Sequence, residues 1–185
     1  MRAFSRRGRI GRTWWSARWT EVLESIGLGD RLHRGRSLAR AGNVFSLDLA
    51  EGLVVAEVSG PRRENYQVRI EVETIPRSGW DRVIEILGRR ALFAARLLAG
   101  EMPPQIGAAF EEAGLALFPR SVEDVSSTCT CDDPAAPCPH AAAVFYLMAE
   151  RFDQDPFQIF LLRGLGRAEL LEELKQPQGR RPPCP

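Results

Sequence analysis

Four residues of the types that bind metal ions fall within twelve positions of the sequence. They are Cys129, Cys131, Cys138 and His140, and their spacing is C-x-C-x6-C-x-H. Three thiolates and one imidazole form one of the usual tetrahedral ligand sets of structural zinc. The cluster therefore predicts one structural zinc ion held by all four side chains.

The residues around the cluster indicate how these side chains come together. If 129–131 is extended, Cys129 and Cys131 point to the same side of a strand and can face one ion. Pro139 suits the first turn of a helix, because the N–H that it lacks has no partner there. The apolar run 141–149 continues that helix. Cys138 is then expected at a helix N-terminus, where the dipole and the unpaired N–H groups favour a thiolate.

Three other interpretations of the cysteines are open. A disulfide needs an oxidising compartment, and the arginine-rich start of the chain leads to Trp14 and Trp15 rather than to the apolar segment of a secretory signal. An iron–sulfur cluster mostly takes four thiolates, and buried cysteines without a ligand are the third interpretation. The donor set favours zinc. Cys184, in the proline-rich tail, is expected to be a free thiol with no assigned role.

The remaining sequence predicts an α+β fold with a small antiparallel sheet packed with helices. The alternation of Val68, Ile70 and Val72 with charged residues is typical of a strand with one buried face. We expect strands over 43–49, 53–58 and 66–75, and helices over 14–26, 80–87, 91–99, 104–113, 141–152, 156–162 and 168–174. The stretch 31–41 is interpreted as a basic connection. Because a small sheet is marginal alone, the helices between 80 and 113 are expected to cover one face.

The expected organisation has four parts. They are a flexible basic arm (1–12), an N-terminal α+β region (13–100), a helical region (101–175) that contains a zinc-knuckle hairpin (129–140), and a disordered tail (176–185). A chain of 185 residues with 44% hydrophobic and 26% charged residues is typical of a soluble globular protein. No apolar run approaches the about 20 residues of a membrane helix. We expect a cytoplasmic protein.

Charge is divided unevenly along the chain. Residues 1–40 carry ten arginines against three acidic residues, whereas 101–175 have a net charge of −8. A basic section of this kind often contacts nucleic acid, and the candidate residues are Arg6, Arg7, Arg9, Arg12, Arg34 and Arg36. A solvated surface in a protein biased toward arginine is the alternative interpretation. The acidic half offers a surface to a basic protein partner.

The tryptophans of the basic section have two interpretations. Trp15 and Trp19 repeat at helical spacing with Val22 and Ile26, which predicts a stripe facing the core. Aromatic rings between arginines also stack on bases in single-strand binders. Trp14 lies off the stripe, so it is the better candidate for exposure.

The chain resembles the SWIM zinc-finger family, in particular its small stand-alone bacterial members. The resemblance rests on the ligand spacing and the helix after it, on 155–157 and 162–164, and on similarities upstream at 34–36, 80, 97–103 and 117–119. It covers about 14–174. The resemblance implies a zinc-stabilised module that binds DNA or other proteins, in or beside helicase-type ATPases and transposases. Where the family often has a lysine before the histidine, this chain has Pro139, which supplies no cation to a phosphate.

Catalysis is not expected. Four protein ligands leave no open position for water, and the sequence has no G-x-x-x-x-G-K-[ST], H-E-x-x-H or G-x-S-x-G motif. The expected function is a non-catalytic interaction module in nucleic-acid transactions that partners a helicase-type ATPase, as the resemblance implies, with no membrane and no small-molecule substrate. The alternative is direct binding of DNA or RNA through the basic section, with a purely structural zinc site.

Overall fold

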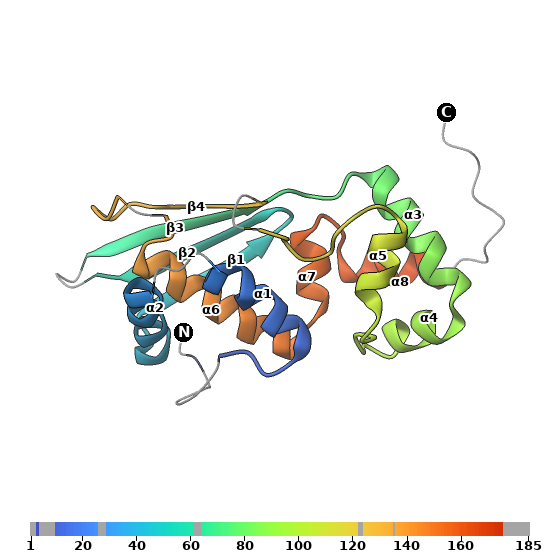
Figure 1. Cartoon of the computed structure of the whole chain (residues 1–185), viewed down its shortest axis with the longest axis horizontal. Coiled ribbons are helices and arrows are strands. Elements are labelled where there is room, and N and C mark those ends of the chain that lie inside the picture. Colours follow the sequence, from blue (N-terminus) through green and yellow to red (C-terminus); the bar gives the residue numbers. More distant parts are fainter. Residues whose placement is uncertain are drawn as a thin grey trace.

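The computed structural model describes residues 3, 10–25, 29–60, 64–121, 124–134 and 136–175. Its elements in chain order are α1 (Trp14–Ser25), α2 (Gly29–Ala41), β1 (Val44–Ala50), β2 (Leu53–Ser59), β3 (Asn65–Val72), α3 (Arg77–Arg89), α4 (Ala91–Leu98), α5 (Ile106–Glu112), β4 (Val125–Cys129), α6 (Pro139–Gln154), α7 (Phe157–Leu162) and α8 (Arg167–Lys175). Figure 1 shows the sheet above one group of helices and a second group of helices beyond its end. The predicted α+β class is confirmed.

The sheet has four antiparallel strands in the order β1-β2-β3-β4, one more than the sequence predicted. On β3 the expected alternation is confirmed, because Val68, Ile70 and Val72 are buried and the residues between them are exposed. The added strand, β4, pairs with β3 along its whole length. Its serine- and threonine-rich sequence has no apolar alternation, so the local pattern does not reveal it.

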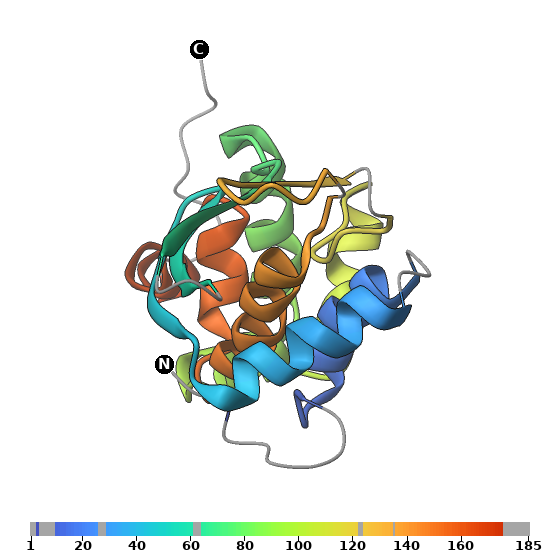
Figure 2. The same ribbon diagram turned by 90° about the vertical axis from the view of Figure 1, so that its left-hand side faces the viewer.

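Helix α6 fills the space between the sheet and the two N-terminal helices. Figure 2 shows α6 with the strands on one side and α1 and α2 on the other. All residues of 141–150 are buried, which suits a helix enclosed on every side. The prediction that helices between 80 and 113 cover the sheet is wrong, because α6 lies under the sheet and α7 packs on β1.

Residues 29–41 form helix α2, so the prediction of a basic connection over 31–41 is wrong. The buried side of this helix carries only Leu32, Gly35 and Ala39, which is too little apolar area to give an amphipathic pattern. Gly35 allows α2 to approach α6 closely, because a Cβ added there would lie 2.5 Å from the Cβ of Ala142. The helix is therefore held by the fit of its backbone against α6.

Helix α1 packs on α6 through its aromatic side chains. Trp19 is 2% exposed, and its ring stacks on Phe145 with the centroids 5.4 Å apart. Trp15 is half-buried and donates its indole N–H to the carbonyl of Phe152 at 2.8 Å. Trp14 is 37% exposed, in agreement with its place off the predicted stripe.

The segment before α1 is anchored at both of its described ends. Ala3 and Ile10 are buried, and the N–H of Ala3 donates to the carbonyl of Ala39 at 2.9 Å. The N–H of Thr13 donates to the carboxylate of Asp153, near the end of α6, at 3.0 Å. The basic residues of 4–9 lie outside the described residues.

The second group of helices packs around α7 and α8. The predictions over 80–87, 91–99 and 104–113 correspond to α3, α4 and α5. Trp80 lies at the centre of this group, 5.5 Å from the ring of Phe110 and 6.0 Å from that of Phe160. Its indole N–H donates to the carbonyl of Arg163 at 3.1 Å, so a buried polar group is satisfied.

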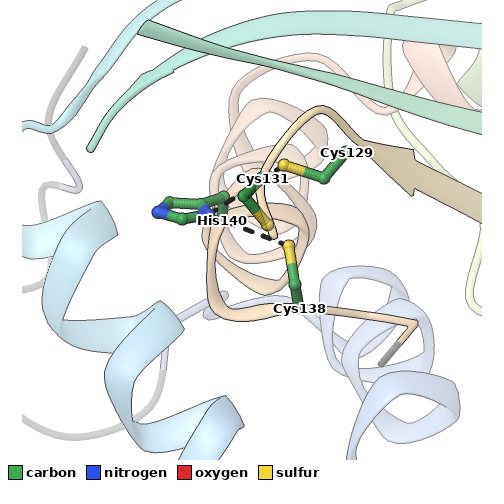
Figure 3. Close-up of side chains that lie close together, drawn as sticks. All are labelled: Cys129, Cys131, Cys138 and His140. Carbon is green, nitrogen blue, oxygen red and sulfur yellow. Dashed lines mark hydrogen bonds between the residues drawn. The ribbon is translucent and has the colours of Figure 1, made fainter. Parts of the chain in front are cut away.

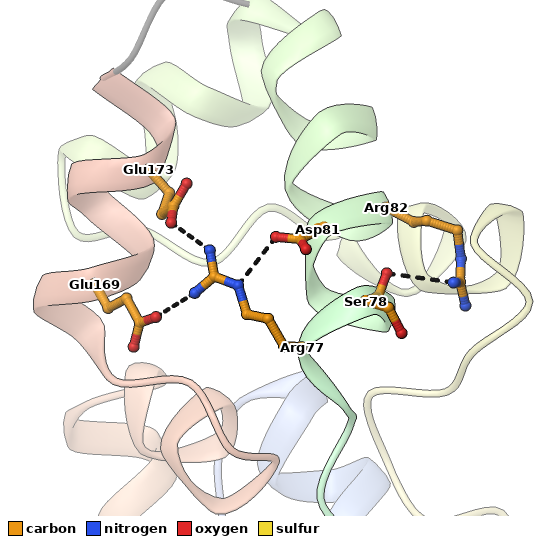
Figure 4. A network of polar contacts seen from close by, with 6 residues as sticks. All are labelled: Arg77, Ser78, Asp81, Arg82, Glu169 and Glu173. Carbon is orange, nitrogen blue, oxygen red and sulfur yellow. Dashed lines mark hydrogen bonds and ion pairs between the residues drawn. The ribbon is translucent and has the colours of Figure 1, made fainter. Parts of the chain in front are cut away.

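An arginine joins the first and last helices of this group. Figure 4 shows the guanidinium of Arg77 on α3 between Asp81 on the same helix and Glu169 and Glu173 on α8. The hydrogen bond that Arg77 donates to Glu173 is the largest cause that raises the pKa of Arg77, and the charge of Asp81 adds to it, against a smaller opposing effect of burial. The network fixes α8 beside α3.

Candidate metal centre

The four predicted ligands meet at one point in the structure. The donor atoms of Cys129, Cys131, Cys138 and His140 all lie within 4.8 Å of one another. His140 Nδ1 is 3.9 Å from the Sγ of Cys129 and 3.9 Å from the Sγ of Cys138. Figure 3 shows the sulfur atoms grouped beside the imidazole, between the end of β4 and the start of α6.

This arrangement fits a tetrahedral metal ion. With zinc–sulfur distances of about 2.3 Å and zinc–nitrogen distances of about 2.0–2.1 Å, neighbouring ligand atoms are about 3.5–3.8 Å apart. The donor separations here, at most 4.8 Å, are larger by about 1 Å or less. The three cysteines are free thiols and not disulfides. The four residues therefore lie close enough to bind a metal ion as a Cys3His set, and their donors are compatible with zinc.

The first pair of ligands is held by the neighbouring strand. Cys129 ends β4 opposite Val68 of β3, and Cys131 follows two residues later. Between them, the N–H of Thr130 donates to the carbonyl of Gln67, and its hydroxyl accepts from the Gln67 N–H, both at 3.0 Å. β3 thus fixes the backbone that carries both thiols.

The second pair of ligands is held by the start of α6. Cys138 is the N-cap residue, its Sγ accepts the N–H of Ala141 at 3.4 Å, and Pro139 occupies the first turn, as predicted. Cys138 is buried and His140 is half-buried. The unpaired N–H groups of this helix end stabilise negative charge on the Cys138 sulfur.

The thiol protons are shared unequally within the cluster. A hydrogen bond from the Cys129 thiol lowers the pKa of Cys138, and His140 and the Ala141 N–H add to this against the opposing effect of burial. The contact with Cys138, followed by burial, raises the pKa of Cys129, while burial raises the pKa of Cys131. Cys138 is therefore the most acidic of the three thiols, and metal binding would release protons from the thiols that carry them.

Two neighbours of the site were not predicted from the sequence. The ring of Tyr66 on β3 lies against the imidazole of His140, with centroids 4.7 Å apart. Arg31 on α2 forms an ion pair at 3.3 Å with Asp133, in the loop between the two ligand pairs. A groove of about 510 Å³ between α2 and this loop is also bordered by Arg34. These contacts depend on strand pairing and on the position of α2, so no local signal marks them.

The arginines predicted to contact nucleic acid do not share one environment. They are Arg6, Arg7, Arg9, Arg12, Arg34 and Arg36, of which the first three lie outside the described residues. Arg12 and Arg34 are exposed, and Arg34 alone among the described members of this set borders the groove beside the metal site. Arg36 forms an ion pair with Glu24 at 3.0 Å and donates to the hydroxyl of Tyr146 at 3.0 Å. Nucleic-acid contact through these residues stays a prediction.

The chain is similar to a protein of Mycobacterium tuberculosis, the uncharacterized protein Rv2102, to which it is 49% identical over 174 residues. The alignment covers 94% of this chain and 63% of that protein, so the chain spans less than two thirds of the relative's length. No family model and no solved structure matches the chain. Within the described residues, no helix combines the length and the apolar character needed to cross a membrane.

Proposed function

We propose that this chain is a non-catalytic zinc-binding protein of the SWIM type, which acts as an interaction module in nucleic-acid transactions and partners a helicase-type ATPase. The observation that carries the proposal is the convergence of C-x-C at the end of β4 and C-x-H at the start of α6 on one point. The proposed role in nucleic-acid transactions and the proposed ATPase partner are taken from the resemblance to the SWIM family in ligand spacing. The thiols would persist as ligands in a reducing cytoplasm.

The position of the site supports a structural role for the ion. The ion would join the edge strand β4 to α6, the central helix, whose residues 141–149 are all part of the core. All four donors come from the protein, so the tetrahedral shell is closed and no position is left for a water nucleophile. These features support an ion that stabilises a surface for recognition and takes no part in a reaction.

Direct binding of DNA or RNA is the second candidate function. Arg34 is exposed on α2 with no ion pair among the described residues, and it borders the groove that also contains Tyr66. A cation beside an aromatic ring is the combination that holds a phosphate and stacks a base. Asp132 borders the same groove and would repel a phosphate, so we rank this function second.

The partner is tested by purification from native cells with the full chain as bait. Copurification of an ATPase with the zinc-loaded chain, and its loss after chelation of the metal, would support the proposal. A zinc-loaded chain that retains no ATPase would contradict it.

The second function is tested by fluorescence anisotropy of labelled single- and double-stranded DNA and RNA over a salt series. Because Ile10 is buried, removal of residues 1–12 would damage the core, so substitution of Arg6, Arg7 and Arg9 by glutamine is the better variant. Arginine contacts to phosphate would give a steep fall in binding with salt, and the variant would reduce the slope. No binding at low salt would contradict direct contact.

A further inference from the structure

The two edges of the sheet are built differently, and β1 is the protected one. Its register shifts between Val44 and Ser46, and Asp48 is exposed on it. The guanidinium of Arg151 on α6 donates to the outward carbonyl of Leu47 at 3.0 Å. Irregular register, charges and covering side chains are the features by which proteins keep an edge strand from pairing with another chain.

The other edge, β4, has none of these features. Its five residues, Val-Ser-Ser-Thr-Cys, include no charged residue and no proline. Its register with β3 is continuous. The second half of the strand and the loop residues Asp133, Pro134 and Ala136 border a crevice of about 200 Å³.

The hydrogen-bond pattern shows which backbone groups of β4 are available. The N–H of Thr130 donates to β3, and in an antiparallel ladder alternate residues do the same. Ser126 and Thr128 therefore bond to β3, whereas the N–H and C=O groups of Ser127 and of the two residues at the strand ends point away from the sheet. Among the described residues, no hydrogen bond reaches the outward groups of Ser127.

We propose that β4 pairs with β4 of a second copy of this chain, antiparallel and centred on Ser127, so that two four-stranded sheets become one. A two-fold axis at Ser127 sets its outward groups opposite those of the second copy's Ser127. The same axis sets Val125 opposite the second copy's Cys129. The backbone N–H and C=O groups of both residues also point away from the sheet. The pairing is self-complementary, as an interface between identical subunits requires. It concerns the assembly of the chain itself and does not rest on the proposed nucleic-acid role.

The side chains of β4 favour a second copy over an unrelated strand. In this register Ser126 lies opposite the second copy's Thr128, and both are exposed hydroxyl residues. Such pairs stabilise antiparallel strands, and like charges in these positions would repel. A pairing of five residues per copy buries much less than the about 1,600 Å² of a standard interface, so we expect weak association, micromolar or weaker.

The first test is sedimentation velocity of the full, zinc-loaded chain under reducing conditions, from about 1 µM to about 1 mM. We expect a reversible monomer–dimer equilibrium. Ser127→Pro removes the outward N–H and leaves the ladder with β3 intact, so it should weaken the dimer at least about tenfold. Ser127→Ala keeps that N–H and is the matched control, with an unchanged dissociation constant.

A second set of variants tests the register without loss of a backbone group. Ser126 lies beside Glu71 on β3, and Thr128 lies beside Arg69, so Ser126→Lys and Thr128→Glu each place a charge next to its opposite. In the two-fold register the double variant also forms two opposite-charge pairs across the axis. Its dimer should be several-fold tighter than that of either single variant.

Four results would overturn the proposal. They are a chain that stays monomeric up to about 1 mM, a dimer that persists in Ser127→Pro, a dimer that reducing agent dissolves, and a double variant no tighter than its singles. The exposed apolar side chain of Leu92 on α4 offers a different contact. A dimer lost in Leu92→Glu but kept in the β4 variants would move the interface to α4 and would likewise refute pairing through β4.

Discussion

Replacement of Gly35 by alanine should destabilise the protein, although alanine is the better helix former. The added Cβ would lie 2.5 Å from the Cβ of Ala142 and 3.0 Å from the carbonyl oxygen of Pro139. Carbon atoms in contact are about 3.5–4.0 Å apart, so α2 must move away from α6 by about 1 Å. Overpacking of this kind costs about 1–3 kcal/mol. The helix preference of alanine offsets about 1 kcal/mol of this, which leaves a net loss of up to about 2 kcal/mol.

The assay is urea unfolding of the zinc-loaded chain, compared with a glycine that has free space around it. Gly107 lies in α5, and a Cβ added there meets nothing within 4 Å. Gly107→Ala should therefore stabilise the protein by about 0.5–1 kcal/mol. Two substitutions of the same chemical type should then change the free energy of unfolding in opposite directions.

The zinc affinity of Gly35→Ala is a second test of the contact between α2 and α6. Gly35 touches the first turn of α6, which also carries Cys138 and His140. A displacement of α2 there should weaken zinc binding in competition with a chromogenic chelator, whereas Gly107→Ala should leave the affinity unchanged. A Gly35→Ala chain with equal or higher stability and unchanged zinc affinity would refute the argument that close packing at Gly35 positions α2.

The remaining predictions concern the metal, an anchoring carboxylate and the groove. Cys138→Ala should lose stoichiometric zinc by elemental analysis and melt well below the parent, since structural zinc contributes about 10–16 kcal/mol in small peptides, whereas Cys184→Ala should keep the ion. Burial raises the pKa of Asp153, but hydrogen bonds from the start of α1 outweigh it and leave the pKa below its ordinary value. The carboxylate therefore stabilises the fold fully above about pH 4, and this contribution is lost as the pH falls through the lowered pKa. Asp153→Asn should cost about 1 kcal/mol in urea unfolding at neutral pH, with a smaller difference from the parent in acid. Arg34→Gln should reduce the salt slope of any nucleic-acid binding by about one.

Each of these expectations has a result that contradicts it. A Cys138→Ala chain that retains one zinc ion would remove Cys138 from the ligand set. A difference between Asp153→Asn and the parent that stays constant down to about pH 2 would show that the carboxylate does not act through its charge. Binding with an unchanged salt slope in Arg34→Gln would place the phosphate contact elsewhere on the chain.

The metal site was the most predictable part of this protein. Its ligands come in two short pairs, and each pair is positioned by local chemistry that the sequence displays, an extended C-x-C and a helix that begins at Pro139. The helices over 141–152 and 156–162 were predicted for the same reason, since long apolar runs and proline starts are local features. The strand with Val68, Ile70 and Val72 was predicted because one face is buried and the other is in water.

The parts that were missed depend on contacts between distant segments. Helix α2 has few apolar residues, so its sequence shows no amphipathic pattern. Its position depends on the close approach of Gly35 to α6, which is possible because glycine has no side chain. Strand β4 has hydroxyl side chains, and its conformation comes from the ladder with β3. The wrong assignment of the helices that cover the sheet has the same origin. Several helices have a suitable apolar face, and only the chain's path decides which one lies under the strands.

The metal site lies where these missed contacts meet, and this argues that the ion stabilises more than its own loop. Cys129 belongs to a strand paired with β3, Cys138 begins the helix that fills the core, and the Arg31 ion pair ties α2 to the loop between them. Loss of the ion would leave three thiols and an imidazole in a half-buried cluster without their common partner. At this point the end of β4 and the start of α6 would then be joined only by hydrogen bonds among these side chains, which are weaker than bonds to a metal ion. The edge of β4 that we propose as the dimer contact ends at Cys129, so metal removal should weaken dimerisation as well as stability.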